Sequence, residues 1–281
     1  MIEAILLGVA QDAGVPQLGC KCLRCHTARR VPAQRRFAVS LALVDHPANR
    51  FWLIDATPDF REQLDGLWMQ YPEYTLAGIW LTHTHIGHYT GLIHLGKESL
   101  NTREVPIYAT ESVLTFLREN KPWHGLFEAG NVVGVMVAGG TPHTLTNGLR
   151  VVPVPVPHRD EWSDTVAYRL EGHKCHLFYC PDIDSWDVWA HDIRIYLADI
   201  DVALLDATFF SSDELPGRDL TEIPHPLAQD TVKRLTGTTC SVGLIHLNHS
   251  NPLLDADSAA RRWVEEAGFF VGKRGMRWQF V

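Results

Sequence analysis

The stretch that decides the fold is Leu81-Thr82-His83-Thr84-His85-Ile86-Gly87-His88-Tyr89-Thr90-Gly91. It follows an apolar, β-prone run and places imidazoles at positions i, i+2 and i+5. In an extended strand exit, residues i and i+2 project to the same side, so His83 and His85 can bind one metal ion through nitrogens about 2.0–2.1 Å from it. His88 then points elsewhere, towards a second ion. Three histidines this close together favour a metal site over three separate structural roles.

Polar residues also stand at the ends of other apolar runs. Ligands of open α/β sheets collect outside one end of the strands, so these residues can converge on one site. Any single Asp at a strand end is more simply explained as a turn residue, but three of the six residues are histidines. The six are Asp55, His83, His158, Asp182, Asp206 and His246.

Strand-like and helix-like segments are interspersed along the whole chain, which predicts an α/β layer structure. Strands are predicted at Ile2–Val9, Ser40–Val44, Phe51–Ile54, Gly78–Thr82, Val105–Ala109, Val132–Val137, Leu149–Val156, Thr165–Leu170, His176–Tyr179, Val202–Leu205 and Ser241–His246. Helices are predicted at Pro58–Gln70, Thr110–Glu119, Ser185–Ala190, Pro226–Leu235 and Asp257–Ala267, with Thr110 and Asp257 as N-caps. No Pro/Gly/Ser-rich linker divides the chain, so we expect residues 1–281 to form a single domain.

Composition limits the function classes. The 281 residues carry a formal charge of −8 and are 46% hydrophobic, which is ordinary for a globular protein and argues against a nucleic-acid partner. We find neither a signal peptide nor an apolar run of the roughly 18 residues that a membrane helix needs, so we expect no membrane association and a cytoplasmic location. The expected partner is a small-molecule substrate, and the sequence leaves open whether the chain forms a homodimer.

The histidine pattern resembles that of the metallo-β-lactamase superfamily, whose signature is His-x-His-x-Asp-His followed by a later His, a bridging Asp and a final His. The resemblance implies an αββα sandwich, in which two mixed β-sheets are covered by helices. It further implies that His83, His85 and His158 bind a first ion, that Asp182 bridges two ions, and that His88 and His246 bind the second.

One position departs from the signature. Gly87 stands where the family has Asp, so the second site is expected to lose a carboxylate and to hold its ion weakly. Substituting Asp at this position would restore the pattern, unless glycine is needed for its backbone conformation or for the room it leaves.

Within the superfamily, the chain resembles the branch of the pyrroloquinoline quinone (PQQ) biosynthesis protein B and, more distantly, the cyclic-phosphate phosphodiesterases of phosphonate breakdown. The matching pieces are Gly14–Gln17 with Cys20–Cys25, Asp55–Asp59, His88–Leu92, Leu205–Thr208 and Ile245–Asp255. In the quinone-biosynthesis family the two positions of His-x-His are degenerate, whereas this chain keeps both imidazoles. It is therefore interpreted as a paralogue with its own chemistry.

Three of the six cysteines, Cys20, Cys22 and Cys25, form a compact C-x-C-x-x-C knuckle. Structural zinc takes four ligands, and the alternative of three free thiols in an exposed loop would leave them open to oxidation. Resemblance to the phosphodiesterases implies that His249 is the fourth ligand of a structural Zn²⁺.

His225, between two prolines, matches a histidine of the quinone-biosynthesis branch. It is a candidate proton donor to substrate, with an ordinary surface role as the alternative. The remaining cysteines, Cys175, Cys180 and Cys240, are assigned to packing.

The leading functional hypothesis is metal-dependent hydrolysis of a small ester, phosphodiester or amide by a metal-activated water, with Asp182 and His225 as catalytic residues and Zn²⁺, Fe²⁺ or Mn²⁺ at the active site. An alternative is a non-heme-iron oxidative enzyme of cofactor biosynthesis, because His88, His246 and Asp182 could form a facial triad. A second alternative is a carrier that binds a small molecule without catalysis.

Overall fold

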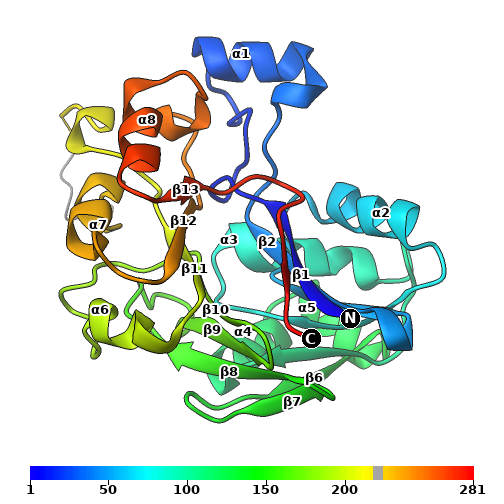
Figure 1. Ribbon diagram of the computed structural model, residues 1–281. Helices are drawn as coiled ribbons and strands as arrows, with labels where there is room; N and C mark the ends of the chain where they lie inside the picture. Colours follow the sequence, from blue (N-terminus) through cyan, green and yellow to red (C-terminus); the bar gives the residue numbers. More distant parts are fainter. Residues whose placement is uncertain (218–223) are drawn as a thin grey trace.

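The computed structural model describes residues 1–217 and 224–281 and builds them into two seven-stranded sheets with helices outside (Figure 1). The first sheet has the order β14-β1-β2-β3-β4-β5-β6 and the second β13-β12-β11-β10-β9-β8-β7. Each sheet mixes antiparallel and parallel neighbours, since β2 pairs with β3 antiparallel and β3 with β4 parallel, while β9 pairs with β10 antiparallel and β10 with β11 parallel. The predicted αββα sandwich with two mixed sheets is therefore confirmed.

The strands have the following bounds. The first sheet contains β1 (Ile2–Gly8), β2 (Ser40–Asp45), β3 (Arg50–Ile54), β4 (Thr75–Trp80), β5 (Val105–Ala109), β6 (Val132–Met136) and β14 (Arg277–Gln279). The second contains β7 (His143–Thr146), β8 (Leu149–Pro155), β9 (Val166–Gly172), β10 (His176–Cys180), β11 (Val202–Asp206), β12 (Ser241–Ile245) and β13 (Phe270–Val271). Because β14 pairs with β1, the two termini lie side by side (Figure 1).

Helices α2, α4 and α5 pack on the outer face of the first sheet, and α6, α7 and α8 on that of the second. The α-helices are α1 (Leu23–Arg30), α2 (Phe60–Gln70), α3 (Ile86–Tyr89), α4 (Glu111–Glu119), α5 (Trp123–Glu128), α6 (Ile193–Tyr196), α7 (Ala228–Leu235) and α8 (Ala259–Glu266). The 3₁₀ turns are η1 (Pro32–Gln34), η2 (His46–Ala48), η3 (Thr90–Leu95), η4 (Leu197–Asp199), η5 (Ser212–Glu214) and η7 (Pro252–Leu254). In the described ranges, no helix has both the length and the apolar character needed to cross a membrane.

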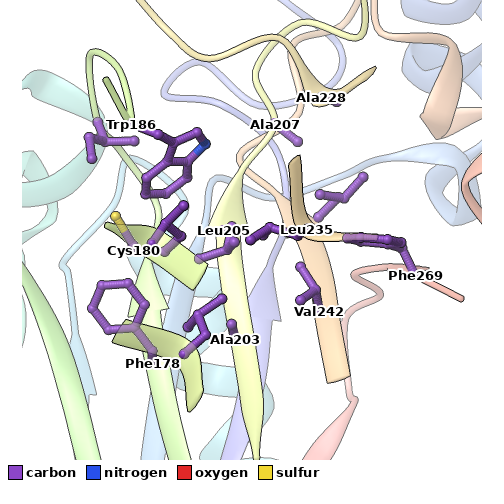
Figure 2. Packing of buried hydrophobic residues seen from close by; sticks show 14 of the residues in the cluster. Phe178, Cys180, Trp186, Ala203, Leu205, Ala207, Ala228, Leu235, Val242 and Phe269 are labelled. Atoms are coloured by element: carbon purple, nitrogen blue, oxygen red, sulfur yellow. The ribbon is translucent and has the colours of Figure 1, made fainter. Parts of the chain in front are cut away.

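Strand β11 shows why the central strands read as continuous apolar runs. Val202 and Leu204 point into the core between the sheets, while Ala203 and Leu205 point the other way, towards the helices. Figure 2 shows this outer layer, where Leu205 packs near Leu235 of α7. A strand covered on both faces buries every side chain, so its sequence loses the alternation of polar and apolar residues.

The predicted strands are all present, but one predicted helix is wrong. Residues 185–190 form turns, not a helix. Trp186 and Trp189, three residues apart, produced the helical spacing, and both rings are buried in the outer core, where Trp186 donates to Thr231 Oγ1 and Trp189 to Pro155 O. The N-cap of α8 is Ser258, whose Oγ accepts from Arg261 N, and not Asp257. The short elements β7, β13, β14, α1, α3, α5 and α6 gave too little periodicity to be predicted.

Candidate metal centre

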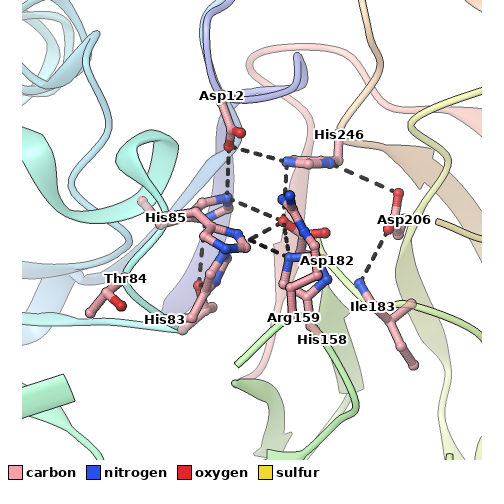
Figure 3. A network of polar contacts seen from close by, with 12 residues as sticks. Asp12, His83, Thr84, His85, His158, Arg159, Asp182, Ile183, Asp206 and His246 are labelled. Atoms are coloured by element: carbon pink, nitrogen blue, oxygen red, sulfur yellow. Dashed lines mark hydrogen bonds and ion pairs between the residues drawn. The ribbon is translucent and has the colours of Figure 1, made fainter. Parts of the chain in front are cut away.

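Residues from both sheets meet at the carboxyl ends of the strands to form a first set of ligand atoms. His83 and His85 follow β4, His158 follows β8 and Asp182 follows β10. One ligand atom from each of these four residues lies within 4.8 Å of all the others. Nε2 of His158 is 3.2 Å from Oδ2 of Asp182, and Nε2 of His83 is 3.5 Å from the same oxygen (Figure 3). The structure therefore brings together the residues predicted for the first ion.

A second set shares Asp182 and includes a residue that the sequence reasoning missed. It consists of Asp12, His88, Asp182 and His246, again with one atom of each within 4.8 Å of the others. Nε2 of His88 and Nε2 of His246 both lie 3.7 Å from Oδ2 of Asp182. Asp12 approaches from the loop after β1 (Figure 3). No motif marks this aspartate in the sequence, because it stands alone between a strand and the cysteine knuckle.

Histidine nitrogens of both sets lie 3.2–3.7 Å from Oδ2 of Asp182, a spacing that fits divalent metal ions. Two ligand atoms that each lie about 2.1 Å from one tetrahedral ion are about 3.4 Å apart, which is longer than a direct hydrogen bond. The buried atoms His83 Nε2, His88 Nε2, His246 Nε2, Asp12 Oδ1 and Asp182 Oδ1 find no hydrogen-bond partner among the described residues. Buried polar atoms without partners are rare in folded proteins. Several of them pointing at common centres are what a binuclear metal site requires.

Asp55 and Thr82 orient two of the histidines. Nδ1 of His88 donates to Oδ2 of Asp55 at 2.8 Å. The hydroxyl of Thr82 donates to the same carboxylate at 3.0 Å and accepts from Nδ1 of His83 at 2.9 Å. Because Nδ1 carries the proton in both rings, Nε2 keeps its lone pair for an ion.

Asp206 and Thr208 repeat this arrangement on the second sheet. The hydroxyl of Thr208 donates to Oδ1 of Asp206 at 2.7 Å and accepts from Nδ1 of His246 at 2.8 Å. Nδ1 of His225 donates to Oδ2 of Asp206 at 2.8 Å and lies 3.3 Å from Oδ1 of Asp182. His225, a predicted catalytic residue, is therefore buried beside the ligand sets and is not a surface histidine. Asp55 and Asp206, which the sequence showed only as strand ends, act as orienting groups.

His158 and His85, the other two histidines of the first set, are held by the carboxylates of Asp184 and Glu161. Nδ1 of His158 donates to Oδ1 of Asp184 at 2.9 Å, so Nε2 is the nitrogen of this ring that keeps its lone pair. His85 faces His158 through Nδ1 at 3.0 Å, and its Nε2 lies 3.3 Å from Oε2 of Glu161. His85 would therefore bind an ion through Nδ1.

The charges around the ligand sets keep the carboxylates ionised. Burial raises the pKa of Asp182, but the charges of His158, His246 and His225 outweigh burial and hold this pKa well below its ordinary value. Burial likewise raises the pKa of Asp12, and its contacts with His246 and His88 lower it well below the ordinary value. Both side chains are thus in the form that binds a cation.

The position of Gly87 explains the departure from the family signature. A Cβ at Gly87 would lie 2.1 Å from Oδ1 of Asp12 and 2.6 Å from its Cα, far inside van der Waals contact. Glycine is needed here for room, and the room is taken by the carboxylate of Asp12. The expectation that only His88, His246 and the shared Asp182 remain at the second site did not include Asp12, whose carboxylate the structure places beside them.

The cysteine knuckle forms a separate group of ligand atoms. Sγ of Cys20 and Sγ of Cys22 lie 3.6 and 3.8 Å from Nδ1 of His249, and one atom each from Cys20, Cys22, Cys25 and His249 lies within 4.8 Å of the others. Thiolate and imidazole ligands of one tetrahedral zinc ion are about 3.5 Å apart. The four residues predicted for the structural Zn²⁺ are thus in position to hold it.

An open groove of about 720 Å³ adjoins the first ligand set through Glu161. Its walls carry the aromatic rings of Phe116 and Trp162, and Trp162 is 65% exposed. The charged side chains that line the groove are all acidic, and they are Glu111, Glu119, Glu161 and Asp164.

Comparison with protein families identifies a beta-lactamase superfamily domain over residues 50–266. The chain is 28% identical to the coenzyme PQQ synthesis protein B of Methylobacterium nodulans, over 98% of this chain and 99% of that protein. It is 29% identical to the protein of the same name from Nitrosococcus oceani, over 96% of this chain and 97% of that protein. The chain thus matches these relatives over nearly their whole length.

Two solved structures share the fold. Zinc-bound PqqB from Methylobacterium extorquens superposes with a TM-score of 0.82 at 22% identity and covers 99% of both chains. A diphosphatase of the PhnP family superposes with a TM-score of 0.71 at 23% identity and covers 99% of this chain and 96% of its own. At these identities the likeness establishes the fold alone.

Proposed function

The chain belongs to the beta-lactamase superfamily, and from that premise we propose that it is a metal-dependent hydrolase of a small-molecule ester, phosphodiester or amide. The observation that carries the proposal is the first ligand set, in which three imidazoles and the carboxylate of Asp182 surround a centre with Nε2 of His83 unpartnered among the described residues. Three imidazoles with water or substrate as a further ligand are typical of hydrolytic zinc sites, and an ion that also contacts Asp182 would bind that water as a fifth ligand.

The surrounding residues support acid–base roles. An ion at this site would act as a Lewis acid and would lower the pKa of a water molecule that it binds. Asp182, which belongs to both ligand sets, is positioned to orient that water. Burial lowers the pKa of His225, but the charges of Asp206 and Asp182 outweigh it and raise this pKa, so the ring can donate a proton to a leaving group.

The acidic groove bears on the substrate class. Four carboxylates repel a phosphodiester, while Trp162 and Phe116 offer apolar surface and cation–π contacts to a neutral or cationic group. A substrate that reaches His85 along this groove is therefore expected to be an ester or amide and not a phosphodiester.

The relatives named for coenzyme PQQ synthesis support a role in the synthesis of this or a similar cofactor. A strain that lacks its own PQQ synthesis protein B tests that role. Restored PQQ formation on expression of this chain would support the role. If the cell extract hydrolyses an ester or amide but forms no PQQ, the proposed hydrolysis would stand and the role in PQQ synthesis would not.

An oxidative function is the second candidate, because the second set contains a two-histidine, one-carboxylate group. His88, His246 and Asp182 are the residues of a facial triad for Fe²⁺, with molecular oxygen as the co-substrate. The presence of Asp12 as a further carboxylate in the same set distinguishes this site from an open triad and favours hydrolysis.

The deciding experiment compares turnover in protein loaded with Zn²⁺, Mn²⁺ or, without oxygen, Fe²⁺. A chromogenic lactone, an anilide and a phosphodiester are the substrates, His158→Ala removes a ligand, and His191→Ala, an exposed histidine outside the ligand sets, is the matched control. We expect hydrolysis that His158→Ala abolishes and His191→Ala retains. Oxygen consumption by the Fe²⁺ form, with no hydrolysis by any form, would overturn the proposal in favour of oxidation.

A further inference from the structure

The carboxylate of Asp12 and the missing side chain of Gly87 occupy the same space. A Cβ at Gly87 would lie 2.1 Å from Oδ1 of Asp12 and 2.7 Å from its Cγ. The two residues are far apart in sequence, yet only one of them can carry a side chain at this point. A glycine here is thus compatible with a second metal site only if the other chain segment provides the carboxylate.

Asp12 points into the second ligand set and not away from it. Its Oδ1 lies 3.3 Å from Nε2 of His88 and 3.7 Å from Nε2 of His246, and none of these three atoms has a hydrogen-bond partner among residues 1–217 and 224–281. Its other oxygen, Oδ2, accepts from Nε2 of Gln11 at 3.1 Å, which fixes the carboxylate plane. The side chain is held by one oxygen and presents the other to the two imidazoles.

The distances favour a shared ion over a direct ion pair. A hydrogen-bonded pair would close to about 2.7–2.9 Å, whereas ligands of one tetrahedral ion stay about 3.4 Å apart. Nδ1 of His88 already donates to the fully buried Asp55 at 2.8 Å, so the ring has a carboxylate partner without Asp12. Asp12 is therefore not needed to pair His88, and an ion between them uses all three unpartnered atoms.

We infer that Asp12 is the carboxylate ligand of a second active-site ion, held together with His88, Asp182 and His246, in place of the aspartate that the superfamily signature carries at position 87. The inference rests on the proposed metal-dependent function. It states how many ions that same site binds and which carboxylate binds the second one.

The backbone around Asp12 is built to hold it in this position. The bridge between Ala10 and Leu247 pairs the Asp12 loop with the residue that follows His246, and Gln11 N donates to Leu247 O at 3.0 Å. A ligand pair on two adjacent, hydrogen-bonded segments keeps its spacing without the ion. The site is thus preorganised for binding.

The test counts ions in the intact chain without any substrate. Asp12→Asn keeps the size of the side chain and removes its charge. Asp59→Asn makes the same change at an aspartate that packs against the same loop at Gly14 but lies outside the ligand sets. We expect zinc-loaded Asp12→Asn to contain one ion fewer per chain than the wild type and Asp59→Asn to contain the full number.

A second measurement, which begins with the wild type, keeps the inference testable if Asp12→Asn folds poorly. In Mn²⁺-loaded wild type, two ions about 3.5–4 Å apart give a spin-coupled electron paramagnetic resonance signal. Asp12→Asn should convert that signal to one of isolated ions, while His158→Ala should remove the other ion of the pair. A wild type with uncoupled Mn²⁺ only, or an Asp12→Asn variant with unchanged ion count and coupling, would overturn the inference. A protein that binds both ions but hydrolyses nothing would contradict the proposed function and leave the assignment of Asp12 intact.

Discussion

Nδ1 of His88 donates to Oδ2 of Asp55 at 2.8 Å, and both side chains are completely buried. The same carboxylate accepts from the backbone N–H and the hydroxyl of Thr82, which in turn accepts from His83. One aspartate thus fixes the tautomers of a histidine in each ligand set. An acidic group outside the ligand sets thus decides which ring nitrogens are available to bind an ion.

Asp55→Asn is expected to weaken ion binding at the second set by about 10- to 100-fold. Asn tolerates the left-handed backbone of this position, where φ is +68°, so the fold should persist. An amide N–H facing His88 would move the ring proton to Nε2 and block the lone pair. Isothermal titration with Zn²⁺ measures the effect, and unchanged affinity would show that the Asp55 contact does not set the tautomer.

Cys22→Ser should remove the structural zinc ion and lower the melting temperature, because binding energy at such a site is also folding energy. The knuckle follows the Asp12 loop and His249 follows His246, so we also expect weaker ion binding at the second set. Zinc content and thermal unfolding are the measurements. Cys175→Ser, outside the ligand groups, is the control and should leave the zinc content unchanged. An unchanged melting temperature in Cys22→Ser would refute the structural role.

Thiol alkylation should separate the cysteines by their pKa values once metal has been removed. Burial raises the pKa of Cys22, but the backbone N–H of Cys25 and the ring of His249 outweigh it and lower this pKa to about 6. Burial raises the pKa of Cys25 to about 11 and that of Cys240 to about 12. Cys22 is thus mainly thiolate at neutral pH.

The iodoacetamide reaction of Cys22 in metal-free protein should therefore slow about tenfold from pH 7 to pH 5, as protonation replaces the thiolate. Peptide mass spectrometry locates the label. Zinc should protect the residue, and faster labelling of Cys240 than of Cys22 would contradict this order.

Gly87→Asp is expected to lower stability by on the order of 1–3 kcal/mol, because the new side chain collides with Asp12. Zinc content should fall, since Asp12 must move. Gly125→Asp is a matched control, because a Cβ at Gly125 meets no atom of the described part of the chain within 4 Å. Higher zinc occupancy in Gly87→Asp at unchanged stability would show that the carboxylate can be supplied from either position.

The sequence predicts the strands well because β11 and its neighbours are apolar runs bounded by polar residues. The helix predicted from the spacing of Trp186 and Trp189 is absent, because these two large rings, three residues apart, belong to a buried turn. The histidines could be found from their spacing and from the family signature. Asp12 could not, since its role depends on a loop that tertiary pairing brings to Gly87.

The ion complement of the centre is tested most directly by a crystal structure of the zinc-loaded protein with anomalous scattering recorded at the zinc edge. We predict one peak among Cys20, Cys22, Cys25 and His249, one among His83, His85, His158 and Asp182, and one among Asp12, His88, Asp182 and His246. A map with no peak among Asp12, His88, Asp182 and His246 would contradict the second ion, and a map with a peak at the cysteine knuckle alone would contradict the active-site metal centre as a whole.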